Sequence, residues 1–150
     1  MRAVRAFLRL PAPGVLVLAA LCAPVPACTV RLIAEYDERT EQEASRLERE
    51  MDLFLTRLSS KPATEATYEA SGAFYDEHET DVRALRLRAE ALPKNEISSR
   101  QLGKIEESVR ELREAHRGKP LTKQAALVAR DLFNISWKAI LTLELAKKRA

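Results

Sequence analysis

The residues best suited to metal binding or acid–base chemistry in this sequence are its two histidines, His78 and His116. A di-iron carboxylate bundle uses Glu-x-x-His on two helices, because that spacing places both ligands on one helix face. Tyr75 stands three residues before His78 and Arg113 three residues before His116, so the motif is absent at both positions. We expect His116, near the end of a predicted helix, to interact favourably with the helix dipole.

The sequence around His78 is acidic, with Asp76, Glu77, Glu79 and Asp81. Because these carboxylates stand beside it, His78 is the candidate ligand for a single zinc or copper ion. A histidine hydrogen-bonded to a nearby carboxylate or tyrosine is the commoner arrangement, and it stays open as the alternative. Met51 and His78 are the residue types of a haem axial pair, but the predicted helices place them about one turn apart.

Other catalytic and cofactor motifs are missing from the sequence. It contains no Cys-x-x-Cys-His for covalent haem and no Gly-x-Ser-x-Gly for a serine nucleophile. Its four glycines are not clustered, so a loop that cradles phosphate is missing too. We therefore expect no bound cofactor and no enzymatic activity.

The N-terminal residues have the layout of a secretory signal peptide. Arg2, Arg5 and Arg9 precede the apolar run 15–21, which is too short to cross a bilayer and is followed by small residues and prolines. We therefore predict that residues 1–27 are a signal peptide.

Cys28 follows Val25-Pro26-Ala27, and these four residues resemble a lipobox, the site at which a dedicated peptidase cleaves bacterial lipoprotein precursors. Cys28 is therefore the predicted lipidation site, and residues 28–32 are a short tether. An ordinary signal peptidase would also accept Val25-Pro26-Ala27, and an uncleaved apolar anchor is a third interpretation. Thr29 lacks the acidic character that retains many lipoproteins at the inner membrane. A lipid-anchored protein that faces the periplasm, at the outer rather than the inner membrane, is therefore expected.

The charge of the chain outside the signal peptide is balanced. Removal of residues 1–27 takes three arginines from 25 basic side chains and no acidic one, which leaves 22 of each sign. We therefore expect no nucleic-acid partner. The remaining residues are rich in Ala, Leu, Glu, Arg and Lys and poor in glycine and aromatic residues, which is typical of a single helical domain.

Apolar residues that recur every three or four positions predict four amphipathic helices, at about 33–59, 65–92, 98–117 and 122–148. Short connections make successive helices antiparallel. The predicted fold is therefore all-α, an up-down-up-down four-helix bundle over residues 33–150.

Each predicted helix has an apolar stripe that we expect to form the core. The first stripe contains Ile33, Tyr36, Thr40, Ala44, Leu47, Met51, Phe54 and Leu58. The second contains Tyr68, Ser71, Tyr75, His78, Val82, Leu85, Ala89 and Leu92. The third contains Leu102, Ile105, Val109, Leu112 and either Ala115 or His116. The last contains Ala125, Val128, Leu132, Ile135, Ala139, Thr142 and Ala146, on a helix that is apolar over much of its circumference and is expected to be the most buried.

Local signals place two helix starts and one core layer. Ser98 with Gln101 matches a capping box for the third helix, and Thr122 is the predicted N-cap of the last one. When the helices are aligned about their connections, Tyr36 is predicted to lie near the level of Ala89, Leu102 and Trp137.

Three basic residues, Lys147, Lys148 and Arg149, end the last predicted helix. In an up-down bundle of four helices this end lies beside the start of the first helix, close to the lipidated Cys28. These residues are therefore predicted to be membrane-proximal, near the headgroups. The alternative is that they only complement the negative end of the helix dipole.

Three segments resemble those of a family of small, uncharacterised Gram-negative lipoproteins: the residues from Cys28 to Thr40, the stretch Leu92-Pro93-Lys94-Asn95-Glu96-Ile97, and the ending 143–149. The resemblance covers nearly the whole mature chain. It implies a lipoprotein, and it implies no catalytic residue, because the family has no assigned activity.

The sequence therefore favours a non-enzymatic envelope lipoprotein. Its helical bundle would serve as a structural or interaction module for an envelope protein partner of unknown identity, held at the membrane by the lipid anchor. The alternative is a periplasmic binding protein with a small ligand or metal site between helices.

Overall fold

The computed structural model describes residues 34–149, which form four helices: α2 (Glu38–Ser60), α3 (Gly72–Ala91), α4 (Glu96–Gly118) and α5 (Lys123–Lys147). No strand occurs among the residues of this range. The predicted all-α four-helix bundle is confirmed. The predicted signal peptide, Cys28 and its tether lie outside the described residues.

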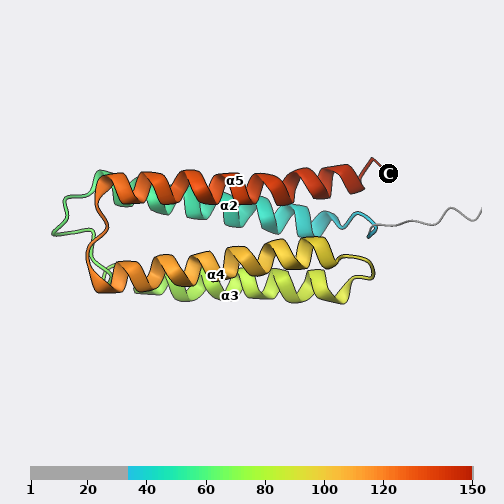
Figure 1. Cartoon of the computed structure of the whole chain (residues 1–150), viewed down its shortest axis with the longest axis horizontal. Helices are drawn as coiled ribbons and strands as arrows, with labels where there is room; N and C mark the ends of the chain where they lie inside the picture. Colours follow the sequence, from blue (N-terminus) through green and yellow to red (C-terminus); the bar gives the residue numbers. More distant parts are fainter. Residues whose placement is uncertain (1–33, 150) are drawn as a thin grey trace, which may run out of the picture. The chain divides into compact units, whose positions relative to one another are not determined.

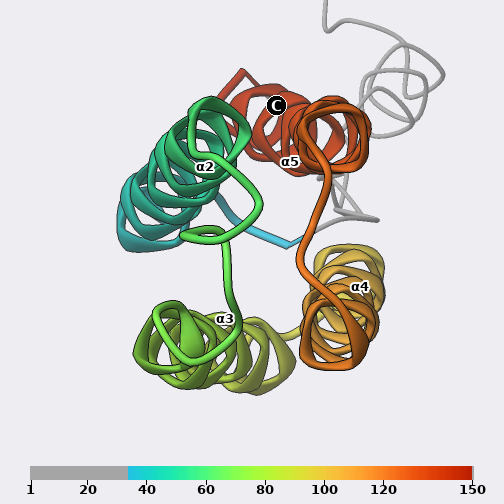
Figure 2. The same cartoon turned by 90° about the vertical axis from the view of Figure 1, so that its left-hand side faces the viewer.

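The helices are arranged around a common axis, as the end-on view in Figure 2 shows. α2 packs most extensively against α5 and α3 against α4, while the α2–α3 and α4–α5 contacts are smaller. Figure 1 shows that the α2–α3 and α4–α5 connections lie at one end of the bundle. The α3–α4 connection, residues 34–37 and the end of α5 lie at the other end, which is called the entry end below.

The core is formed by apolar side chains from all four helices. Its members are Ala44, Leu47, Met51 and Leu55 on α2, Tyr75, Val82, Leu85 and Ala89 on α3, Leu102, Ile105 and Val109 on α4, and Phe133, Trp137 and Ile140 on α5. The predicted stripes of α2, α3 and α4 supply most of these positions. Burial of each leucine-sized side chain stabilises the fold by about 1.5–3 kcal/mol.

α2 begins at Glu38 and not at residue 33 as predicted. The backbone N–H of Ala34 donates a hydrogen bond to the carbonyl oxygen of Lys94 over 3.1 Å, which ties this segment to the α3–α4 connection. Asp37, the residue before α2, has extended backbone angles, φ −121° and ψ 104°, and not helical ones. The first predicted helical turn is therefore replaced by an extended segment.

Tyr36 does not lie level with Trp137 as predicted, although its neighbour Asp37 pairs with Arg88, the residue before Ala89. The Tyr36 ring lies beside Lys148 at the entry end, with the Lys148 Nζ atom 4.9 Å from the ring centroid. Ala89, Leu102 and Trp137 belong to the core cluster, and Tyr36 does not. The error follows from the start of α2, because the layer was counted from a helix that begins five residues too early.

α3 begins at Gly72, seven residues later than predicted. The segment before it forms turns, one of which is closed by a hydrogen bond from Ala66 N–H to Pro62 O over 3.0 Å. Ala66 is fully buried and forms a small apolar cluster with Leu58 and Leu121. This cluster closes the end of the bundle opposite the entry end.

One predicted helix cap is wrong and one is confirmed. α4 begins at Glu96, so Ser98 lies inside the helix, and its hydroxyl donates to Glu144 instead of capping the backbone. Thr122 is the N-cap of α5, and its side-chain oxygen accepts a hydrogen bond from Ala125 N–H over 3.1 Å.

The predicted core stripe of α5 is wrong, because α5 turns a different face to the core. The buried residues of α5 are Ala126, Phe133, Trp137, Ile140, Glu144 and Lys147. All seven residues of the predicted stripe are exposed: Ala125, Val128, Leu132, Ile135, Ala139, Thr142 and Ala146, called the heptad stripe below. α5 is apolar on two faces, and only one of them can face the other helices.

No helix in the range 34–149 has both the length and the apolar character needed to cross a bilayer.

Candidate functional site

A buried ion pair lies at the entry end of the bundle, where the start of α4 meets the end of α5. The Nζ atom of Lys147 is 2.6 Å from Oε1 of Glu144, and the two side chains are only 3% and 1% exposed. Lys147 also donates to Asn95 Oδ1 over 2.5 Å and to Ser98 Oγ over 2.8 Å. These hydrogen bonds compensate for taking a charged pair out of water.

Asn95 and Ser98 hold this ion pair in place from α4. Asn95 is 3% exposed, and its Nδ2 atom donates to the carbonyl oxygen of Ala89 at the end of α3. Ser98 donates to Glu144 Oε1 over 2.8 Å. Three helices are therefore joined by one polar cluster, formed by Asn95, Ser98, Glu144 and Lys147 and called the entry-end cluster below.

The chain segment before α2 is fixed at this same end by an ion pair. The Arg88 guanidinium donates to both carboxylate oxygens of Asp37, over 2.7 and 2.9 Å. This contact lowers the pKa of Asp37 to about 2. Together with the Ala34–Lys94 hydrogen bond it fixes the extended segment to the α3–α4 side of the bundle.

The three predicted membrane-proximal basic residues lie in different environments. Lys147 is buried in the entry-end cluster, so its charge is not available to a membrane surface. Lys148 is exposed and lies over the ring of Tyr36, to whose hydroxyl it donates over 3.3 Å. Arg149 is exposed as well. The expected headgroup contact therefore rests on Lys148 and Arg149.

The candidate ligand His78 lies on the buried face of α3, where it is 1% exposed and stacks on Phe74 with ring centroids 5.2 Å apart. Neither ring nitrogen has a hydrogen-bond partner among residues 34–149. The nearest carboxylate oxygen, on Glu50, is 3.9 Å from Nδ1, which is too long for a hydrogen bond. Burial lowers the pKa of His78 to about 4, so the ring is neutral at pH 7.

A cavity of about 290 Å³ adjoins His78 between α2 and α3. Its lining is Glu50, Leu53, Phe54, Arg57, Phe74, Glu77 and His78. A zinc site needs three or four protein ligands, and no group of three His, Cys, Asp or Glu residues in the described part of the chain is suitably placed. The cavity suits a small, mostly apolar molecule with one polar group better than a metal ion.

His116 has a structural role that the helix dipole does not explain. It is 1% exposed, and Nδ1 lies 3.0 Å from the Tyr75 hydroxyl. Nε2 lies 3.0 Å from the carbonyl oxygen of Ala66. A carbonyl oxygen can only accept, so Nε2 carries the hydrogen and the Tyr75 hydroxyl donates to Nδ1.

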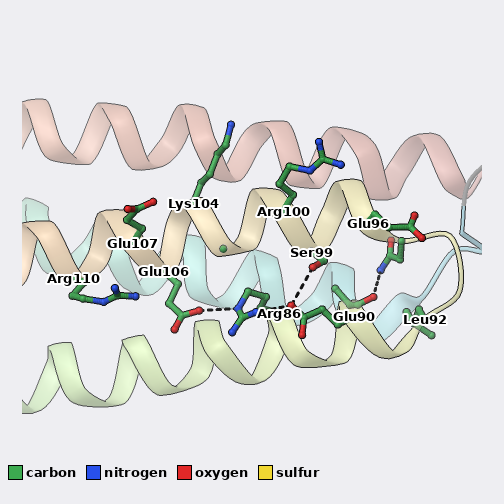
Figure 3. Close-up of a pocket in the computed structure, with 13 residues that line it drawn as sticks. Arg86, Glu90, Leu92, Glu96, Ser99, Arg100, Lys104, Glu106, Glu107 and Arg110 are labelled. Atoms are coloured by element: carbon green, nitrogen blue, oxygen red, sulfur yellow. Dashed lines mark hydrogen bonds and ion pairs between the residues drawn. The ribbon is translucent and has the colours of Figure 1, made fainter.

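A groove of about 700 Å³ runs along α3 and α4, and Figure 3 shows the residues that line it. Arg86 lies in the groove, where it donates to Glu106 over 2.8 Å and to Glu90 over 2.5 Å. Burial raises the pKa of Glu106, but hydrogen bonds from Arg83 and Arg86 outweigh this effect and hold it below the usual range. The side of the groove nearest α3 is therefore neutralised by its own ion pairs.

The α4 side of the groove carries charges that are not neutralised in this way. Arg100, Lys104 and Glu107 make no ion pair with any residue of the described range. In Figure 3 Arg100 and Lys104 point away from α3. The groove thus presents both signs of charge to solvent, which suits a polar macromolecular surface more than an apolar small molecule.

The entry-end cluster is the part of the site that the sequence prediction missed. Lys147 was predicted to lie near the headgroups, and Glu144 was not among the predicted core residues. Glu144 and Lys147 continue the spacing of Trp137 and Ile140 by fours and threes, and this spacing was the available signal. In comparisons with known proteins, no family model, no curated protein and no solved structure matches this chain.

Proposed function

We propose that this chain is a lipid-anchored protein of the bacterial cell envelope. Acylation of Cys28 holds it at the membrane with the bundle facing the periplasm, and the outer membrane is favoured. The bundle is a non-enzymatic structural or interaction module for another envelope component. The lipobox-like residues before Cys28 and the resemblance to small Gram-negative lipoproteins support this proposal.

The observation that carries the proposal is the hydrogen bond between Ala34 and Lys94 at the entry end. Only six residues lead from Cys28 to Ala34, and they span at most about 20 Å at roughly 3.3–3.6 Å per residue. The entry end is therefore held close to a lipid on Cys28. Lys148 and Arg149 are exposed at this end, where each cation gains about 1 kcal/mol next to an anionic surface.

The charged groove along α3 and α4 is the proposed contact surface for the envelope partner. It starts at the entry end, near Leu92 and Asn95, and continues to Arg110. Contacts made by exposed charges are screened by salt over about 8 Å at physiological ionic strength. We therefore expect binding of the partner to weaken steeply as the salt concentration rises.

The anchor is tested by replacing Cys28→Ala in cells supplied with labelled palmitate. The wild-type chain should incorporate the label and sediment with membranes, and the variant should do neither. Cys22→Ala is the matched control, because Cys22 lies within the predicted signal peptide and its loss should change neither result. Full membrane association of the Cys28→Ala chain would contradict the proposal.

The interaction module is tested by pull-down of the lipidated chain in low and high salt. Arg100→Glu together with Lys104→Glu should remove the partner from the bound fraction without changing the circular dichroism of the bundle. Lys123→Glu is the control, since this exposed residue lies at the start of α5, outside the groove. Equal recovery of the partner by all three chains would exclude the groove as the contact.

The second candidate function is that of a periplasmic binding protein, and the cavity beside His78 is the observation that favours it. A ligand at 100 times its dissociation constant stabilises the folded state by about 2.7 kcal/mol. A thermal-shift screen of zinc, copper and small apolar compounds should therefore raise the melting temperature of the wild-type chain. The His78→Phe variant is the control for a ligand that uses the imidazole, and a shift of equal size in the variant would place the ligand elsewhere.

A further inference from the structure

The heptad stripe of α5 is an apolar surface that the bundle does not use. Its largest members, Val128, Leu132 and Ile135, are 48%, 59% and 67% exposed. They lie on the side of α5 turned away from Trp137 and Ile140, which are fully buried. Single exposed leucines are ordinary on a protein surface, but a whole helix face of exposed apolar residues marks a contact with another molecule.

The spacing of the stripe identifies the kind of contact. From Ala125 to Ala146 its residues alternate intervals of three and four without interruption. This spacing is that of a two-stranded coiled-coil seam, in which such positions pack into the matching positions of a second helix. At 1.5 Å per residue the seam is about 32 Å long.

We propose that this face pairs with the same face of a second copy of the chain, with the two α5 helices antiparallel. The pairing is isologous, so that each contact occurs twice about a two-fold axis. In the register that pairs the seam residues from Ala125 to Thr142, Leu132 packs against Ile135 of the second copy. Val128 then meets Ala139, and Ala125 meets Thr142.

The charges beside the seam select the antiparallel orientation. Asp131 and Lys138 flank it on the same edge, each one residue before a seam position. In the antiparallel register Asp131 of one copy lies opposite Lys138 of the other, twice over. In a parallel pair Asp131 would face Ser136 and Lys138 would face Leu143, so no opposite charges would meet.

Both charged residues are available for this contact. Lys138 is exposed and makes no ion pair within the described range, and Asp131 pairs there with its chain neighbour Arg130 over 3.0 Å. Opposite charges across an interface fix its register, and like charges in their place disfavour it. The Asp131–Lys138 pairs therefore distinguish one alignment of the two helices from its alternatives.

The other edge of the seam is free of charge. It carries Ala129, Ser136 and Leu143, and in the same register Ser136 of one copy lies beside Ala129 of the other. An apolar groove of about 310 Å³ between α4 and α5 adjoins this edge beside Leu132 and Phe133. A second helix packed on the seam therefore contacts apolar surface along this edge and forms the charge pairs along the other edge.

This self-association goes beyond the proposed envelope function and does not depend on the lipid anchor. It is tested on the full chain in mild detergent, by analytical ultracentrifugation over a range of concentrations. The wild-type chain should dimerise, and Leu132→Glu should raise the dissociation constant at least about 10-fold, as loss of a central interface contact does. Leu87→Glu is the matched control, because Leu87 on α3 is 53% exposed and lies off the seam, and its dissociation constant should not change.

Charge exchange tests the orientation and guards against a variant that simply unfolds. Asp131→Lys and Lys138→Asp should each weaken the dimer by severalfold, because each places like charges across the interface. The chain with both changes should regain the wild-type dissociation constant, since opposite charges meet again. Failure of the double exchange to restore association would overturn the antiparallel register.

Crosslinking gives an independent measure in a chain whose only natural cysteines are removed as Cys22→Ser and Cys28→Ser. Ser136→Cys should form dimers with a short bismaleimide, because its two copies lie only about 7.5 Å apart along the axis, five residues at 1.5 Å each. Ala139→Cys should not, since its two copies lie about 16 Å apart along the axis, eleven residues at 1.5 Å each. The opposite pattern would overturn the proposal in favour of a parallel pair.

A monomer at all concentrations, with Leu132→Glu reducing binding to lipid vesicles, would overturn it in favour of a membrane contact.

Discussion

The replacement His78→Phe should remove a large part of the acid sensitivity of this bundle. In the folded chain burial lowers the pKa of His78 from 6.5 to about 4, because water is excluded from a ring that is 1% exposed. The charges that face it are Glu50 and Arg46 on α2 and Asp81 on its own helix, and their effects are smaller than that of burial. Phenylalanine keeps the ring and its stack on Phe74 and cannot take up a proton.

The size and the sign of the effect follow from these two values. Between pH 6.5 and 4 the unfolded chain binds a proton at His78 that the folded chain does not, so the free energy of unfolding falls as the pH falls through this window. A difference of one in the pKa between the folded and unfolded chains corresponds to about 1.36 kcal/mol. The difference between 6.5 and 4 therefore lowers the free energy of unfolding by about 3.4 kcal/mol when His78 is fully titrated, and by about 2 kcal/mol between pH 8 and pH 5. Urea unfolding at these two pH values, followed by Trp137 fluorescence, measures the loss.

The wild-type chain should therefore lose about 2 kcal/mol more than the His78→Phe chain between pH 8 and pH 5. His116 and the carboxylates are present in both chains, so their contributions cancel in the difference. The same loss of stability in both chains would refute the reasoning, because it would mean that His78 is protonated as easily in the folded chain as in the unfolded one.

The remaining predictions concern packing and buried polar groups, and each is measured by urea unfolding at pH 7. Trp137→Ala should cost about 3–5 kcal/mol, because it removes a fully buried side chain from the core; a loss below about 1 kcal/mol would place this residue on the surface. Lys147→Met should cost about 3–5 kcal/mol, because Glu144 keeps a buried charge without its partner. Adding Glu144→Leu should recover most of that loss, and an unchanged cost would show that the charge of Glu144 is not the cause. Tyr75→Phe should cost about 1–3 kcal/mol, because Nδ1 of His116 loses its donor; a neutral result would contradict the assigned hydrogen bond.

The helices of this bundle were predictable from the sequence where each had a single apolar face. α3 is the clearest case, since Tyr75, Val82, Leu85 and Ala89 follow one stripe and all of them are buried. α5 was not predictable in this way, because it has apolar residues on two faces. The periodicity is most regular in the heptad stripe, which is exposed, and a helix sequence does not say which of two apolar faces will meet its neighbours.

The contacts at the entry end could not be predicted, because they join residues far apart in the sequence. Ala34 pairs with Lys94, and Asp37 pairs with Arg88, and both residues precede α2. His78 was correctly placed on the buried stripe, but its lack of partners depends on how α2 and α3 pack. The predicted lipidation of Cys28 lies outside the described residues and stays a prediction.

The uneven packing of the four helices has a consequence for the order in which they assemble. α3 and α4 form one extensive pair and are joined by a short connection, so their contacts are local and close quickly. α2 and α5 form the other extensive pair, but residues 61–122 separate them along the chain. Closing so long a segment costs more entropy and is slower. The α3–α4 hairpin should therefore form first, and until α2 docks, both apolar faces of α5 are exposed and open to misassembly.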